Sequence, residues 1–72
     1  MDLPAVVRST HTWDTLPGKD LRCGEEAIVV GVRETEFGGW VWRVIPLENP
    51  RLLEISTGTT PERVLLKWLV PV

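Results

Sequence analysis

The residues that could do chemistry are few and stand apart from one another. His11 is the only histidine and Cys23 is the only cysteine, so the chain offers neither a pair of zinc ligands at the usual spacing nor a disulfide. We expect His11 to be solvated and the Cys23 thiol to be buried and unreactive, as an isolated cysteine in a strand-like context usually is. We expect no metal ion and no other cofactor.

Two acidic pairs are the remaining candidates for catalysis: Glu25 with Glu26, and Glu34 with Glu36. Neighbouring residues on a strand point to opposite faces, so Glu25 and Glu26 cannot act together across one cleft. The second pair lies where a hairpin connection is expected, and solvated carboxylates are the simpler interpretation there. No glycine-rich loop precedes a helix as a phosphate site requires. The sequence therefore predicts that the chain is not an enzyme.

The four tryptophans are many for a chain of 72 residues. A domain of this size has a small core, and each buried indole would contribute about 150–250 Å² to it. Trp13 stands alone in a polar loop, where it either closes over the core or contacts a ligand. The same alternatives are open for Trp42, whereas Trp68 is assigned to the core. We take as candidate ligand-binding residues Trp13, Trp40, Trp42 and Arg43.

A β-hairpin is the element that must position most of these side chains. Residues 25–33 and 40–47 are rich in β-branched and aromatic residues, and they flank a glycine-containing connection at residues 36–39. On the first strand, alternation predicts that the inward face carries Ile28, Val30 and Val32. Gly31 predicts a bulge or a close backbone approach.

On the second hairpin strand, the face opposite to Arg43 is expected to point inward, because an unpaired arginine is rarely found at the centre of a core. That inward face carries Trp40, Trp42 and Val44. Residues 3–8 and 51–56 are expected to be further strands, the latter with Leu53 and Ile55 inward. The tail from residue 60 fits either a helix or a buried strand. We expect one short helical turn near residues 60–64, followed by a strand.

The run from Asp20 to Val30 resembles the stretch that follows the RT loop in SH3 domains. It presents an acidic–Leu pair, a Gly–acidic pair and an Ile/Val strand in that order. Gly39 and Trp40 are similar to the start of the family's tryptophan-led strand, and residues 9–19 have a suitable length for an RT loop. The resemblance covers residues 5–55. It implies a mainly β fold, with residues 1–72 forming a single small SH3-like five-stranded barrel.

The chain departs from SH3 domains at the residues that bind their ligands. It contains no tyrosine and lacks the family's late Pro-x-x-Tyr motif. Either Trp40 or Trp42 can be matched to the tryptophan of the family's groove. The resemblance therefore implies the fold and not the binding of proline-rich peptides.

Charge and composition narrow the classes of partner. Eight basic and ten acidic residues give a net charge of −2, which does not favour tight binding to nucleic acid. We expect no signal peptide, because the first residues have neither a basic nor an apolar region of the usual kind, and no apolar run has membrane-spanning length. A lone cysteine fits a reducing cytosol, so we expect a cytoplasmic protein without a membrane partner.

The predicted function is that of a small non-catalytic module that binds a protein partner or a peptide, as an adaptor, an inhibitor or an accessory subunit. The alternative is a small nucleic-acid-binding barrel, in which exposed tryptophans stack on bases and phosphates are contacted by Arg33, Arg43 and Arg51. The apolar tail at residues 64–72 also predicts a homo-oligomer, because an unpaired apolar edge can pair with a second copy.

Overall fold

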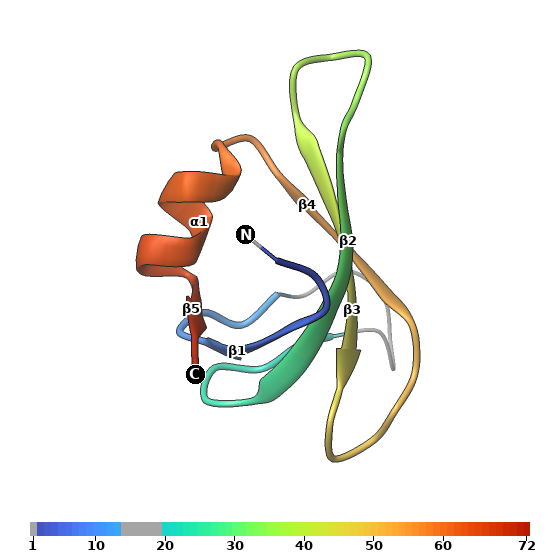
Figure 1. The fold of residues 1–72 in the computed structure, drawn as a ribbon, viewed down its shortest axis with the longest axis vertical. Helices are drawn as coiled ribbons and strands as arrows, with labels where there is room; N and C mark the ends of the chain where they lie inside the picture. Colours follow the sequence, from blue (N-terminus) through green and yellow to red (C-terminus); the bar gives the residue numbers. More distant parts are fainter. Residues whose placement is uncertain (1, 14–19) are drawn as a thin grey trace.

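The computed structural model describes residues 2–13 and 20–72, which form an antiparallel sheet of five strands and a short helix (Figure 1). The elements in chain order are β1 (Ala5–Ser9), β2 (Glu26–Glu34), β3 (Trp40–Pro46), β4 (Leu53–Thr57), α1 (Pro61–Lys67) and β5 (Leu69–Pro71). Their order across the sheet is β4-β3-β2-β1-β5. The mainly β fold is confirmed, while residues 14–19 of the segment likened to an RT loop lie outside the described residues.

The predicted closure into a barrel is wrong, because β4 and β5 form the two open edges of the sheet. β5 has three residues and pairs with β1 alone. α1 lies between these two edge strands in the sequence. Figure 1 shows it beside β5, on the concave side of the curved sheet. The sheet therefore bends around a core without its edges meeting.

The predicted irregularity at Gly31 is confirmed as a bulge in β2. Val29 pairs with Val44 and Gly31 pairs with Arg43, although these two partners are consecutive on β3. Val30 is therefore an extra residue that has no partner of its own. Such a bulge bends a strand and increases its twist.

The predicted inward face of β2 is wrong in its first half. Ala27 and Val29 are fully buried, whereas Ile28 is half-buried and Val30 is 40% exposed. β-Branched residues occupy both faces of this strand, so the alternation did not reveal which face is inside. Because the bulge absorbs one residue, Val32 again packs against the core, as predicted.

The assigned faces of β3 and β4 are confirmed. Arg43 and Glu54 point outward, while Trp40 packs against the core from a half-buried position. The buried hydrophobic cluster consists of Val7, Leu21, Ala27, Val29, Trp42, Val44, Leu53, Ile55, Val64 and Leu69. Trp42 is the largest of these side chains and lies at the centre of the hairpin's inner face.

The tail forms a helix and then a strand, as predicted, but the helix is longer than one turn. α1 has seven residues and begins after Thr60, with Pro61 in its first turn, where a proline costs no hydrogen bond. Val64 is its buried residue, and the N–H of Trp68 donates to the Val64 carbonyl at 2.8 Å. No helix in the described part of the chain is long and apolar enough to span a membrane.

Candidate functional site

A cleft lined by aromatic side chains lies between the loop after β1, the β4–α1 turn and the C-terminal end of α1. It has a volume of about 270 Å³ and is lined, among the described residues, by His11, Trp13, Ser56, Thr57, Gly58, Thr59 and Trp68. We call it the aromatic cleft. None of these lining residues carries a carboxylate, a guanidinium or an ammonium group.

Trp13 is held in the wall of this cleft through both its backbone and its ring. Its N–H donates to the Leu21 carbonyl at 2.7 Å, and its carbonyl accepts from the Leu21 N–H at 3.1 Å. Its indole Nε1 donates to the Oγ of Ser9 at 3.0 Å. The His11 ring meets the Trp13 ring edge-on, with 5.0 Å between the centroids. The indole is therefore fixed in place before any ligand arrives.

Ser9 is the polar residue that organises this wall. Its side chain is buried at the end of β1, with 1% of the residue exposed. Besides accepting from Trp13, its hydroxyl accepts from the His11 N–H at 3.3 Å and donates to the His11 carbonyl. A single buried hydroxyl thus fixes both aromatic residues of the loop.

The opposite wall is tied to the core and to the helix end. The Thr57 hydroxyl accepts from the indole Nε1 of Trp42 at 3.2 Å and donates to the Thr59 carbonyl, also at 3.2 Å. The Trp68 carbonyl accepts from the Thr10 N–H at 2.9 Å. The Lys67 ammonium lies 5.3 Å from the centroid of the Trp68 ring, a cation–π distance. The cleft is therefore a preformed feature, and the Lys67 ammonium lies over one of the rings that line it.

The structure does not bring the four candidate binding residues together. Trp13 lines the aromatic cleft, and Trp40 is half-buried beside Thr57, its partner on β4. Trp42 is 0% exposed, so its ring serves the core and offers no surface to a ligand. Arg43 points outward from the other face of β3. The binding roles of Trp13, Trp40 and Arg43 stay predictions.

Trp68 is the aromatic residue of the cleft that sequence reasoning assigned to the core alone. It does pack against the core, but it is half-buried and also lines the cleft. The signal that could have found it is the cation–aromatic pair of Lys67 and Trp68 at the end of an amphipathic segment. The pair can be interpreted in this way only once the structure shows that α1 ends at these residues.

The three arginines of the nucleic-acid hypothesis lie away from the aromatic cleft. Arg33 Nη2 is 3.9 Å from Glu54 Oε2, on the outer face of the sheet. Arg43 occupies that face too, opposite Glu54 in the register. Arg51 lies in a second hollow and donates to the Asp20 carbonyl at 2.9 Å. These three arginines therefore do not form a row of phosphate contacts beside the aromatic rings of the cleft.

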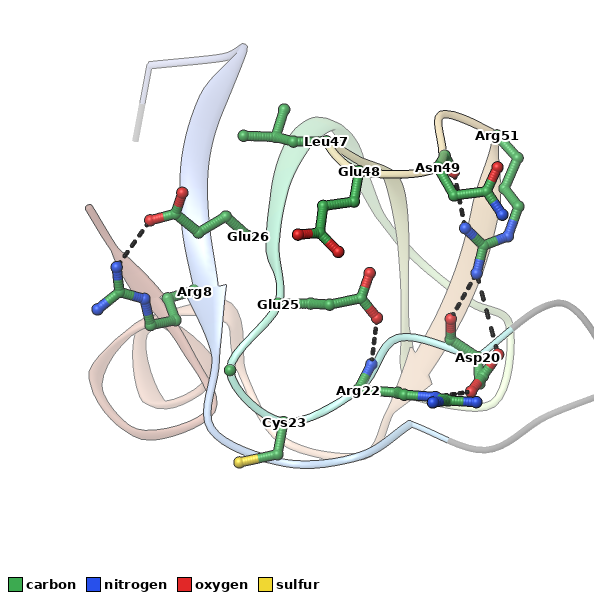
Figure 2. Close-up of a pocket in the computed structure, with 11 residues that line it drawn as sticks. Arg8, Asp20, Arg22, Cys23, Glu25, Glu26, Leu47, Glu48, Asn49 and Arg51 are labelled. Atoms are coloured by element: carbon green, nitrogen blue, oxygen red, sulfur yellow. Dashed lines mark hydrogen bonds and ion pairs between the residues drawn. The ribbon is translucent and has the colours of Figure 1, made fainter.

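That second hollow is a charged groove with a volume of about 770 Å³, which we call the polar groove (Figure 2). It is lined by Arg8, Asp20, Arg22, Cys23, Gly24, Glu25, Glu26, Leu47, Glu48, Asn49 and Arg51. Figure 2 shows the side chains of Glu25 and Glu48 extending into its middle. Arg8 pairs with Glu26 at 2.8 Å on one side of it.

Asp20 is the centre of charge pairing on the other side of the polar groove. Arg22 Nε donates to its carboxylate at 3.0 Å, and Arg51 Nη2 lies 3.9 Å from the same group. The hydrogen bond from Arg22 lowers the pKa of Asp20 below its ordinary value of 3.8, and the charge of Arg51 acts in the same direction. The Glu25 carboxylate accepts from the backbone N–H of Arg22 at 2.9 Å. These charges are satisfied by one another, as expected of a structural network.

The predicted burial of Cys23 is wrong, because the thiol is exposed at the rim of the polar groove. Cys23 stands in the turn before β2 and not in a strand. Gly24 follows it with a φ of +91°, which the backbone of a regular strand cannot have. Predicted solvation of His11 is confirmed, since its side chain is exposed.

In the described part of the chain, no group of three His, Cys, Asp or Glu side chains is arranged to hold a metal ion. The aromatic cleft offers rings, hydroxyls and backbone groups, which suit binding by shape and apolar contact. Comparisons of the chain with models of protein families, with curated proteins and with solved structures gave no match.

Proposed function

We propose that the chain is a small, non-catalytic module for protein–protein interaction, which holds an apolar side chain of a partner in the aromatic cleft. One observation carries the proposal: Trp13 and Trp68, far apart in the sequence, line one cleft from fixed positions. Rigid tryptophan rings provide a large contact area at a low cost in conformational entropy.

The size of the cleft sets the class of ligand. A volume of about 270 Å³ suits one side chain or a short turn of peptide and not a large cofactor. The Thr59 hydroxyl and the backbone groups of residues 57–59 at its margin can bond the backbone of a bound segment. An extended peptide or a protein loop with an aromatic, aliphatic or proline side chain meets these requirements.

The biological role proposed for this binding is that of an adaptor, an inhibitor or an accessory subunit. The proposal keeps the SH3-like resemblance, supported by five antiparallel strands and a long central hairpin, in a form whose sheet is open. It also includes a cytoplasmic setting, supported by the single, exposed and unpaired thiol of Cys23.

Selection of a displayed peptide library on the immobilised protein tests this proposal. Binding of the selected peptides is then measured by tryptophan fluorescence with the wild type and two variants. Gly58→Arg adds a large side chain at an exposed residue that lines the cleft, where a Cβ would meet no atom within 4 Å, so it should weaken binding at least about tenfold. Leu66→Arg introduces the same charge on an exposed position of α1 outside the cleft and should bind as the wild type does.

Equal binding by wild type and Gly58→Arg would show that the cleft is not the site. The same titration with single-stranded oligonucleotides covers the nucleic-acid alternative. Fluorescence quenching that weakens steeply with salt, in the absence of any peptide ligand, would overturn the proposal in favour of that alternative. The separation of Arg33, Arg43 and Arg51 from the cleft makes this result unexpected.

A further inference from the structure

Phe37 is the most exposed large hydrophobic residue described, with 95% of its surface accessible. It lies at the tip of the β2–β3 hairpin, which Figure 1 shows projecting beyond the rest of the molecule. The last pair between β3 and β4 joins Trp40 to Thr57, so the tip continues past the end of β4. An exposed aromatic ring at such a place offers a large apolar area that the pocket of a partner can bury.

The tip is a rigid turn and not a loose loop. The N–H of Thr35 donates to the Gly39 carbonyl at 2.8 Å, and the Gly38 N–H donates to the Thr35 carbonyl at 3.3 Å. The Thr35 hydroxyl accepts from the Gly39 N–H at 3.1 Å. Gly38 has a φ of +82°, which permits the turn. The backbone that carries Phe37 is therefore held in place, so little backbone entropy is lost when the residue is bound.

The charge around Phe37 indicates what kind of pocket would receive it. Glu34 and Glu36 both precede Phe37 in the sequence, and both are exposed. A receiving pocket should be apolar, free of carboxylates and bordered by a cation. An anionic membrane surface does not meet this description, because the two carboxylates would be repelled.

The aromatic cleft of the same protein meets each of these requirements. Its described lining holds two tryptophans and a histidine and includes no carboxylate. The Lys67 ammonium lies over the Trp68 ring at its side. An edge-to-face contact with these rings is favourable for a phenylalanine. None of residues 35–37 lines the cleft within one chain, so Phe37 can reach such a cleft only on a second copy.

We propose that the hairpin tip of one copy inserts Phe37 into the aromatic cleft of a second copy, with Glu36 close to the second copy's Lys67. This inference rests on the proposed function, since it names the partner of the same cleft. The contact joins two unlike surfaces, and it therefore continues head to tail or closes reciprocally. Because a hairpin tip covers a small area, the association is weak and depends on concentration.

Sedimentation equilibrium over a wide range of protein concentration tests the contact. The wild type should associate beyond the 8.1 kDa monomer, and Phe37→Ala should raise the dissociation constant at least about tenfold. Leu66→Ala is the matched control, because it removes another exposed apolar side chain, 82% accessible, on α1. Equal weakening by the two variants would overturn the proposal.

A charge exchange tests the position of Lys67. Glu36→Lys and Lys67→Glu should each weaken association, and the double variant should recover part of the loss, because opposite charges then meet again across the contact. Failure of the double variant to recover any association, with both single variants weakened, would place the two charges apart and contradict the proposed contact.

A mixing experiment distinguishes this contact from any interface between identical surfaces. Phe37→Ala lacks the inserted ring and Gly58→Arg lacks an open cleft, so neither should associate alone. Mixed together, they should form a heterodimer through the intact cleft of the first and the intact tip of the second. No heterodimer on mixing overturns the inference.

The outcome also separates this inference from the proposed function. A wild type that stays at 8.1 kDa at every concentration, but binds selected peptides that Gly58→Arg does not bind, overturns the self-association alone. If neither peptide binding nor association depends on the cleft, both proposals fail.

Discussion

Trp42 and Trp13 make the same kind of hydrogen bond in opposite surroundings. The Trp42 indole donates to a threonine hydroxyl at 3.2 Å, and the Trp13 indole donates to a serine hydroxyl at 3.0 Å. Trp42 is nevertheless fully buried, whereas Trp13 is half-buried and lines a cleft. The difference lies in their neighbours, since Trp42 has β2 and β4 on its two sides and Trp13 is joined to Leu21 by an isolated bridge.

The comparison shows that residue type does not decide whether an indole is core or surface in this protein. A central strand buries a tryptophan because neighbouring side chains cover it from both sides. A loop at the margin of the sheet covers only part of the ring. Both indoles need a hydroxyl partner, because an unpaired N–H is costly in either place.

The largest effect expected is that of Trp42→Ala. Loss of a fully buried indole costs about 3–5 kcal/mol, which is about the whole stability of a domain of this size. The variant should be largely unfolded at 25 °C by circular dichroism. Trp13→Ala, at the cleft, should remain folded with a lower melting temperature. Similar melting curves for the two variants would contradict the distinction between the two sites.

The next effect concerns the two neighbouring valines at the bulge. Val29→Ala removes fully buried methyl groups and should cost about 2 kcal/mol, from about 0.8 kcal/mol per buried carbon plus a cavity term. Val30→Ala alters a residue that is 40% exposed and has no partner in the register, so it should cost less than about 0.5 kcal/mol. Urea unfolding of the matched pair measures both. A larger loss of stability for Val30→Ala than for Val29→Ala would support the inward face that alternation predicted.

A smaller effect is expected from Ser9→Ala, which removes the acceptor of the Trp13 indole. Loss of this hydrogen bond should cost about 1 kcal/mol. It should also free the Trp13 ring, so fluorescence quenching by acrylamide should increase and peptide binding should weaken. Ser56→Ala, at an exposed position, serves as the control and should change stability little. Unchanged quenching in Ser9→Ala would show that the hydroxyl does not fix the ring.

The smallest effect is the pH dependence contributed by Asp20. Because its pKa is lowered by Arg22, the native state binds the proton less well than the unfolded chain does. The resulting stabilisation is complete above the ordinary value of 3.8 and is lost as the pH falls through the lowered value. Thermal melts from pH 5 to about pH 2 should therefore show a shallower decline for Asp20→Asn than for the wild type. Equally steep declines in melting temperature for the two proteins would show that Asp20 does not contribute to the pH dependence of stability.

The hairpin, the inner face of β3 and the inward residues of β4 could be predicted because alternation is a local signal. Trp42 and Arg43 differ so strongly in polarity that their faces are unambiguous. In β2, valine and isoleucine occupy both faces, and the core side was decided by packing against β1 and β3. Local sequence also could not show that β4 and β5 remain apart, because that depends on the path of α1 over the sheet.

The candidate site was predictable only in part for the same reason. Trp13 could be singled out because it is an isolated aromatic residue in a polar loop. Trp68 could not, because its place in the cleft depends on contacts between distant segments, such as the bond from the Thr10 N–H to its carbonyl. Cys23 was misplaced because its neighbour Gly24 turns the chain before β2 begins.

The bulge at Val30 has a consequence for how this chain can change its length. If Val30 were deleted, Val29 and Gly31 would become consecutive and would face Val44 and Arg43, which are already consecutive on β3. Every pair in the hairpin could then be retained, and no side chain would pass from the interior to the surface. Insertion or loss of one residue is therefore neutral to the inside–outside pattern here, while elsewhere in β2 it would exchange the two faces. If related sequences are aligned with this one, we expect a one-residue deletion in β2 to fall at Val30.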